Sequence, residues 1–242
     1  MQVIIGAGEV GRAVFEVLSA KHKCALEDWH YKTATPDVDC LHICFPWYED
    51  EGADNFIGQV KEYKDDIYSG PPVVIHSTVP VGTTAQIPNA VHSPIRGVHP
   101  NLAEGVRTFW KYFAGPRDNA AAAIDIFQDC GVDCVFASED SRTTEAAKLW
   151  STTQYGVSIM VQKAMHAYCE KHGLNFSTIY ADFNCTYNSG YEALDMAHVQ
   201  RPVLQNYPGP IGGHCVIPNA KLLDDDIGAW IIERNELLER GE

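Results

Sequence analysis

The chain has 242 residues, 45% of them hydrophobic and 21% charged, which is typical of a globular protein with one large domain or two smaller ones. Its formal net charge of −14, without a stripe of lysine and arginine, argues against nonspecific binding to nucleic acid. Because no run of about 18 apolar residues occurs and the first residues look like a core strand, we expect neither a membrane span nor a signal peptide.

The cysteines are spread along the chain without a Cys-x-x-Cys pair. Several lie in apolar segments such as residues 40–45, where a small hydrophobic side chain suffices. We therefore expect no disulfides, no metal site, and a reducing, cytoplasmic location.

Residues 1–140 contain short apolar segments that alternate with amphipathic helical patterns. We expect strands at 2–5, 24–26, 41–46, within 71–80, and at 90–92, 109–114 and 132–137, and helices at 10–20, 54–68 and 117–129. This alternation predicts an α/β fold with a Rossmann-type, doubly wound and mostly parallel sheet covered on both faces by helices.

The pattern changes near Ser141. Residues 141–172 predict one long helix that ends at Gly173. One or two further helices are expected within 174–200, then a loop rich in proline and glycine, then a final amphipathic helix from about residue 220. We therefore expect an α/β domain at 1–140 and a smaller all-helical domain at 141–242.

A glycine-rich turn follows the first expected strand. Gly6, Gly8 and Gly11 form Gly-x-Gly-x-x-Gly, which is a weak pattern alone but a strong one between a strand and a helix. The first glycine permits the tight turn, the second lets the backbone approach a pyrophosphate, and the third permits close packing of helix on strand. We therefore expect a dinucleotide with its phosphates at the helix N-terminus. A glycine turn without a ligand is the alternative interpretation.

A carboxylate near the end of the second strand indicates which dinucleotide binds. Asp28 is expected to accept hydrogen bonds from the ribose hydroxyls and to repel a 2′-phosphate, which favours NAD over NADP, with Glu27 as the alternative. The other residues expected to contact the cofactor lie in the glycine turn and after the third and fourth strands: Glu9, Val10, Pro46, Ser77 and Thr78.

Three later segments carry chemistry. Residues 76–84, HSTVPVGTT, follow a strand and would lie at the carboxyl edge of the sheet, where ligands bind in such folds. Residues 144–149, TEAAKL, open the long helix. Residues 208–215, PGPIGGHC, form a loop whose glycines let the backbone approach a ligand closely.

In this order, behind a Gly-x-Gly-x-x-Gly turn, these segments resemble the UDP-glucose/GDP-mannose 6-dehydrogenase family over about residues 1–220. The sequence GGHC after PGP is the most specific part of the likeness. The resemblance implies oxidation of a sugar alcohol to a carboxylate in two NAD-dependent hydride transfers, through a cysteine thiohemiacetal and a thioester.

The resemblance also implies residue roles. Cys215 is the candidate nucleophile, Lys148 the group that stabilises developing oxyanion charge, and Thr78 a residue that positions water or substrate. A thiolate is the reactive form of cysteine, and a cation beside an oxyanion is worth several kcal/mol in a dry site. The remaining candidate substrate residues come from the same segments: Arg96, His99, Thr152, Gly212, Gly213, His214 and Asn219.

This sequence departs from the family pattern at four of its positions. Ile95 and His99 stand where acidic residues are usual, and Thr152 and Asn219 replace an asparagine and an aspartate. Ile95 cannot activate water, so we expect the thioester hydrolysis to be affected. The likeness also stops soon after Cys215, so we expect a short form without the family's C-terminal nucleotide-sugar-binding domain, with that pocket either missing or supplied by a partner subunit.

Other interpretations stay open for these residues. Cys215 can be a loop cysteine without a chemical role, and Lys148 can pair with Glu145 one turn earlier. The histidines at positions 92, 99 and 214 can form a polar cluster or, less in keeping with their spacing, a zinc site. Arg96 can bind an anionic substrate or form a surface ion pair.

The sequence leaves three functions in competition. The first is an NAD-dependent dehydrogenase acting on a sugar, nucleotide sugar or similar small alcohol. The second is a single hydride transfer of the β-hydroxyacid dehydrogenase kind, which needs Lys148 but not Cys215. The third is a non-catalytic NAD-binding module. In each case we expect a homodimer formed through the helix at 141–172.

Overall fold

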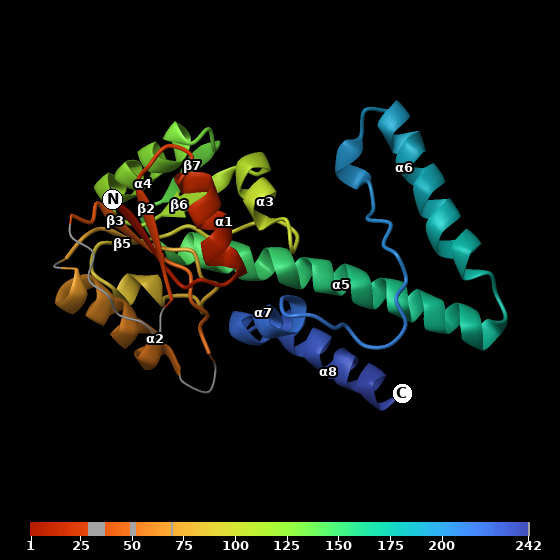
Figure 1. The fold of residues 1–242 in the computed structure, drawn as a ribbon. Helices are drawn as coiled ribbons and strands as arrows, with labels where there is room; N and C mark the ends of the chain where they lie inside the picture. Colours follow the sequence, from red (N-terminus) through yellow and green to blue (C-terminus); the bar gives the residue numbers. More distant parts are fainter. Residues whose placement is uncertain (29–36, 49–51, 69, 242) are drawn as a thin grey trace. The chain divides into compact units, whose positions relative to one another are not determined.

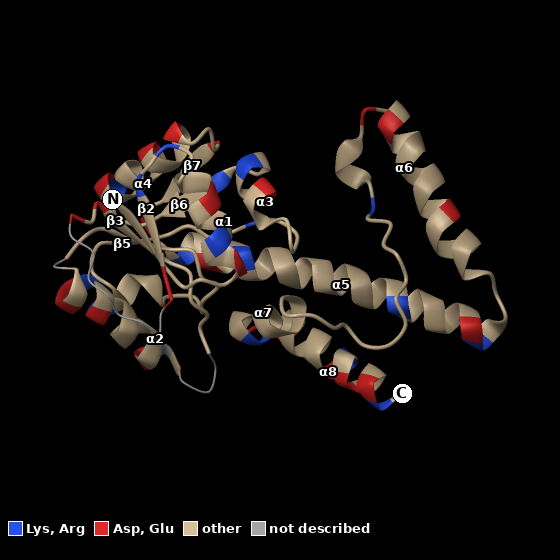
Figure 2. Ribbon diagram, in the orientation of Figure 1, with Lys and Arg blue, Asp and Glu red and all other residues tan. Residues whose placement is uncertain are grey.

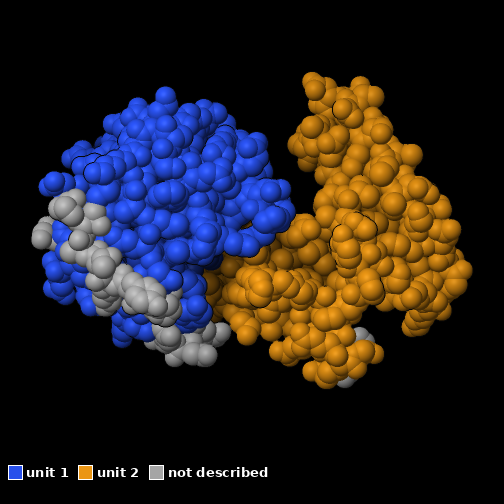
Figure 3. Space-filling model, in the orientation of Figure 1, with its two compact units in different colours: residues 1–148 blue, residues 149–242 orange. Residues whose placement is uncertain are grey.

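The computed structural model describes residues 1–28, 37–48, 52–68 and 70–241 (Figure 1). The chain divides into two compact units, Met1–Lys148 and Leu149–Glu242, which Figure 3 colours separately. The division falls inside the helix α5, Arg142–His172.

Unit 1 contains a seven-stranded sheet in the described part of the chain, in the order β2-β1-β3-β4-β5-β6-β7. All neighbouring strands are parallel except β5 and β6, which are antiparallel. The predicted α/β class with a mostly parallel sheet is therefore confirmed. The strands are β1 Gln2–Ile5, β2 Cys24–Glu27, β3 Cys40–Ile43, β4 Val73–Ile75, β5 Ala90–His92, β6 Lys111–Ala114 and β7 Cys134–Ser138.

Helices cover both faces of this sheet, which explains why its strands are apolar on both sides. Alternate residues of β1 enter different cores: Ile4 packs in one, and Val3 and Ile5 pack in the other. The first core lies under α1 (Glu9–Leu18), α3 (Leu102–Thr108) and α4 (Arg117–Asp129), and the second lies under α2 (Gly52–Lys61) and the π-helical turn η1 (Glu62–Ile67).

The helix predicted at 54–68 is thus an α-helix that ends as a π-helical turn. Helix α3 and the short 3-10 turn η2, Thr84–Gln86, were not predicted. Each has seven residues or fewer, too few to show a helical period in the sequence.

Unit 2 is helical. The long helix ends at His172, and Gly173 follows with φ +63, as the sequence predicts. The remaining elements are η3 Ser177–Asp182, α6 Phe183–Ala193, η4 Ala197–Val199, α7 Val216–Leu223 and α8 Asp226–Arg240. Gly156 on α5 permits close contact with α7, because a Cβ there would lie 2.6 Å from Val216 Cγ1.

The final helix expected from about residue 220 begins later, at Asp226, because α7 and α8 are separate helices. Asp224 between them has a left-handed backbone, with φ 51, and interrupts the helical hydrogen bonds. The Asp225 carboxylate then accepts a hydrogen bond from Ile227 N at 2.9 Å and caps α8. The hydrophobic pattern of the sequence does not show this break, because both helices bury apolar side chains.

Charged side chains are scattered over the helices of both units (Figure 2). Between Lys148 and Lys163, however, α5 carries no charged residue. None of the described helices, the 31-residue α5 included, is long and apolar enough to cross a lipid bilayer.

Candidate functional site

The glycine turn between β1 and α1 contains two kinds of glycine. Gly6 has φ +108, and a Cβ there would lie 2.7 Å from Phe45 N. At Gly11 a Cβ would lie 1.7 Å from Gly6 O. Both are therefore required by the packing of the turn. Gly8 differs, because a Cβ there would meet no described residue within 4 Å apart from its own chain neighbours.

The first turn of α1 meets the requirements of a phosphate site. Gly8 precedes the helix as its N-cap residue, and no side chain within the described ranges accepts a hydrogen bond from the first turn. Its unpaired N–H groups and the helix dipole favour an anion, and the open space at Gly8 leaves room for one. The Glu9 carboxylate pairs with His99, and both side chains are exposed.

The two candidate ribose carboxylates at the end of β2 have different surroundings. Glu27 is buried and accepts a 2.6 Å hydrogen bond from the Tyr68 hydroxyl. Asp28, which follows it, is exposed. Of the two carboxylates, that of Asp28 is therefore the more accessible to a ligand.

The loops after β3 and β4 lie beside the glycine turn, since β1, β3 and β4 are neighbouring parallel strands. Pro46 is exposed, and the buried Ser77 hydroxyl donates a 2.6 Å hydrogen bond to Phe45 O, which joins the two loops. The Thr78 hydroxyl is half-buried and has no hydrogen-bond partner among the described residues. The candidate residues of the glycine turn, Pro46, Ser77 and Thr78 therefore share one edge of the sheet.

Lys148 is held at the same edge, after the next strand. Its ammonium donates a 2.9 Å hydrogen bond to the carbonyl of the buried Ile95, which follows β5. Glu145, considered above as a partner for this lysine, accepts hydrogen bonds from Gly82 N and Thr84 N.

The other polar candidates of unit 1 contact different partners. His92 is completely buried and hydrogen-bonds to Thr144, whereas His99 is partly exposed beside Glu9. Arg96 is exposed, and its guanidinium lies over the rings of Phe109 and Tyr112, at 5.3 Å and 5.9 Å from their centroids. Sequence reasoning suggested a histidine cluster, but His92 and His99 have distinct partners.

The remaining candidates belong to unit 2. Cys215 is exposed and directly precedes α7 as its N-cap residue, after the exposed Gly212, Gly213 and His214. Thr152 and Asn219, which stand at two positions where the sequence departs from the family pattern, contact each other: Asn219 Nδ2 donates to Thr152 Oγ1 at 3.0 Å.

Sequence reasoning missed Asn235 on α8. Its buried side chain binds both backbone groups of Ile211, accepting from the N–H at 2.5 Å and donating to the carbonyl at 3.4 Å. Ile211 directly precedes the glycines that lead to Cys215. The available indication in the sequence was that this asparagine follows the apolar Ile231 by one helical turn, on the face that α8 buries.

A buried polar chain inside the sheet was also missed. His42 Nδ1 lies 3.1 Å from His76 Nε2, and Lys111 Nζ lies 3.3 Å from His76 Nδ1. Burial lowers the pKa of His42 to about 3 and that of Lys111 to about 7, so both histidines and part of the lysine population are neutral at pH 7. A histidine inside the apolar run CLHICF was the indication.

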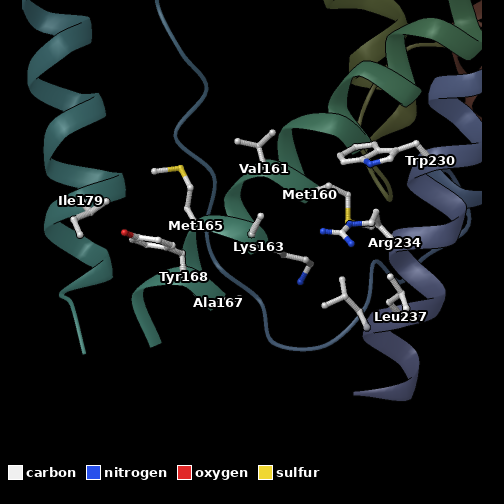
Figure 4. A pocket seen from close by; sticks show the side chains of 12 residues that line it. Met160, Val161, Lys163, Met165, Ala167, Tyr168, Ile179, Trp230, Arg234 and Leu237 are labelled. Atoms are coloured by element: carbon white, nitrogen blue, oxygen red, sulfur yellow. The ribbon is translucent and has the colours of Figure 1, made fainter. Parts of the chain in front are cut away.

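A groove of about 710 Å³ lies on unit 2 between α5 and α8 (Figure 4). Met160, Val161 and Tyr168 come from α5, and Trp230 and Arg234 come from α8. The Arg234 side chain extends from α8 toward Met160, and among the described residues no carboxylate pairs with it.

Three solved structures are similar to the chain over nearly its whole length. A UDP-D-ManNAc dehydrogenase from Pyrococcus horikoshii has a TM-score of 0.76 and 16% identity, covering 98% of this chain and 69% of its own. A UDP-glucose dehydrogenase from Pyrobaculum islandicum has a TM-score of 0.72 and 14% identity, covering 97% of this chain and 67% of its own. Mycobacterium tuberculosis 3-hydroxyisobutyrate dehydrogenase has a TM-score of 0.68 and 12% identity, covering 96% of this chain and 91% of its own.

No known family profile and no curated protein matches the sequence. At these identities the similarity establishes the fold alone. The chain therefore has the fold of the sugar-nucleotide and hydroxyacid dehydrogenases, with a Rossmann-type sheet followed by a helical part.

Proposed function

We propose that this protein is an NAD-dependent dehydrogenase that oxidises an alcohol of a sugar, a nucleotide sugar or a similar small molecule. One observation carries the proposal: the uncapped glycine turn at Gly8 shares a sheet edge with Ser77, Thr78 and Lys148. The fold, which is shared with dehydrogenases, supports it.

The residues at this edge have complementary tasks. The first turn of α1 would hold the pyrophosphate and Asp28 a ribose, and the bound NAD would supply the hydride acceptor. The unpartnered Thr78 hydroxyl can hydrogen-bond the substrate. The Lys148 ammonium orients the reacting oxygen and balances the negative charge that develops when the hydroxyl loses its proton.

We further propose that Cys215 performs the second half of a two-step oxidation. Its thiolate would add to the aldehyde carbon to form a thiohemiacetal. That intermediate would lose its hydride to a second bound NAD and its hydroxyl proton to solvent, which leaves a thioester on Cys215. Water then releases the carboxylate and the thiol. Support comes from the exposed thiol at the start of α7 and from the GGHC loop before it.

Substitution of Cys215 by serine separates this mechanism from a single hydride transfer. We expect Cys215→Ser to release aldehyde and to form one NADH per substrate in place of two. Unchanged turnover to the acid would remove the covalent step. It would favour a β-hydroxyacid type of reaction, for which the hydroxyisobutyrate dehydrogenase provides a fold precedent.

The dehydrogenase proposal is tested by calorimetric titration with NAD and NADP, followed by NADH formation on a panel of nucleotide sugars and hydroxy acids. We expect NAD to bind more tightly than NADP and at least one alcohol class to react. Binding of NAD without turnover on any class would favour the non-catalytic module, and no dinucleotide binding would overturn both.

We also propose a homodimer formed through α5. The uncharged stretch of this helix exposes Trp150, Tyr155 and Val161, which are 42%, 52% and 49% exposed. Val161 also lines the groove of Figure 4, whose Arg234 has no carboxylate partner among the described residues and suits an acidic side chain from a second copy of this acidic chain.

A further inference from the structure

The loop that follows β4, residues 77–84, is held at two points by buried side chains outside it. This loop carries the candidate substrate residue Thr78, and α5, which packs against it in unit 1, carries Lys148. The two fixed points connect the loop to the first turn of that helix. The side chains that make these contacts are buried, although Gly82 itself is half-buried, so water competes little for the hydrogen bonds.

The first point is the carboxylate of Glu145, which is 1% exposed. One oxygen accepts a hydrogen bond from Gly82 N at 2.6 Å, and the other accepts from Thr84 N at 2.8 Å. Each oxygen thus satisfies one backbone donor of the loop in a charge-assisted hydrogen bond. Glu145 lies in the first turn of α5, where the helix dipole favours its negative charge.

The second point is His92 at the end of β5. Its Nε2 lies 3.3 Å from the Ser77 carbonyl and its Nδ1 lies 2.8 Å from the Thr144 hydroxyl. Burial lowers the pKa of His92 to about 3, so the ring is neutral and carries one proton. The Ser77 carbonyl can only accept, so its hydrogen bond requires the proton on Nε2, and Thr144 is then the donor to Nδ1. The Thr144 hydroxyl also lies 3.2 Å from Ser141 O and 3.4 Å from His92 O.

We propose that Glu145 and His92 are positioning residues that hold the loop after β4 against the first turn of α5. They thereby keep Thr78 and Lys148 in a fixed arrangement around the substrate. This inference rests on the dehydrogenase activity proposed above. Both residues act through others, since Glu145 binds only backbone N–H groups of the loop and His92 binds Ser77 and Thr144.

Two substitutions test the two points separately in the full chain with NAD bound. Glu145→Gln places an amide NH₂ opposite a backbone donor, so one hydrogen bond is lost with little change in shape. Thr144→Val removes the hydroxyl that donates to His92, and Thr144→Ser restores it. Gln86→Ala is the matched control, because the exposed Gln86 side chain only donates to Gly82 O at 3.3 Å.

Amide hydrogen exchange at Gly82 and Thr84 measures whether the loop is held. We expect exchange at least tenfold faster in Glu145→Gln and about threefold faster in Thr144→Val, with wild-type rates in Thr144→Ser and Gln86→Ala. Unchanged rates in a folded Glu145→Gln would overturn the proposed hold on the loop. If that variant does not fold, comparison of Thr144→Val with Thr144→Ser decides by the same exchange measurement whether His92 holds the loop.

Turnover per folded molecule measures whether the hold serves catalysis. We expect kcat to fall 10- to 100-fold in Glu145→Gln while KM for NAD stays within threefold, because misplacement of about 1 Å carries such a penalty. Faster exchange with unchanged kcat would overturn the catalytic part. If the wild-type chain turns over no alcohol, the dehydrogenase proposal itself fails, and exchange alone then decides whether the loop is held.

Discussion

At the scale of single residues, Lys111 lies in an environment that few lysines occupy. It is 4% exposed, its Nζ donates to Ser93 O at 3.1 Å, and it lies 4.9 Å from the centroid of Phe127. None of its hydrogen-bond partners among the described residues is a carboxylate. Burial lowers its pKa to about 7, the nearby thiols of Cys134 and Cys44 oppose that shift, and Lys148 adds to it.

The folded protein should therefore gain stability as the pH rises from about 7 toward 10.5. Over this range the unfolded chain keeps the Lys111 proton while the folded chain has lost it. Folding therefore releases a proton, and the free energy of that release becomes more favourable as the pH rises. We expect a gain of about 2 kcal/mol between pH 7 and pH 9 from this residue. Urea unfolding at both pH values measures it.

The matched variant is Lys111→Met, which keeps the apolar length of the side chain. Its unfolding free energy should be higher than that of the wild type at pH 7, and the difference should shrink by pH 9. A wild-type advantage at pH 7, or the same pH slope in both proteins, would show that Lys111 stays charged in the fold.

At the scale of elements, the turn from β1 to α1 separates folding from ligand binding. Gly8 has φ −74, which any residue adopts, and its Cβ direction is open. We expect Gly8→Ala to keep the wild-type unfolding free energy within about 0.5 kcal/mol. The same variant should lower NAD affinity at least tenfold, because the methyl group occupies the space over the helix N-terminus.

Gly11→Ala should instead lower the unfolding free energy by several kcal/mol, because its Cβ would lie 1.7 Å from Gly6 O. Gly190→Ala on α6, where the Cβ direction is also open, is the control for both. Thermal unfolding and calorimetry give the two readouts. Wild-type NAD affinity in Gly8→Ala would contradict binding of the pyrophosphate at the N-terminus of α1.

The loop before Cys215 depends on a side chain from α8. Asn235→Ala would leave the buried Ile211 N–H without its acceptor and lower the unfolding free energy by about 1–3 kcal/mol. Gln205→Ala in the same loop, where the exposed side chain accepts only from Tyr207, should cost less than about 0.5 kcal/mol. Equal effects in chemical denaturation would remove the special role of Asn235.

At the scale of the whole molecule, the apolar surface of α5 predicts self-association. We expect light scattering to give twice the 26.8 kDa of one chain. Val161→Glu should shift the protein toward the monomer, because it places a charge in the apolar groove. Leu194→Glu, at an exposed position after α6, should leave the mass unchanged. A concentration-independent wild-type monomer would contradict the dimer.

The sequence by itself determined the α/β class, the glycine turn, the strands that carry the candidate residues and the length of α5, because these depend on local period and backbone constraint. It joined α7 and α8 and omitted α3, since short elements leave little periodic pattern. Only the tertiary structure decided which groups meet: Glu145 with the loop amides, Asn219 with Thr152, and Lys111 with His76. Such contacts join residues far apart in the chain, and their free energy depends on burial, which local pattern does not specify.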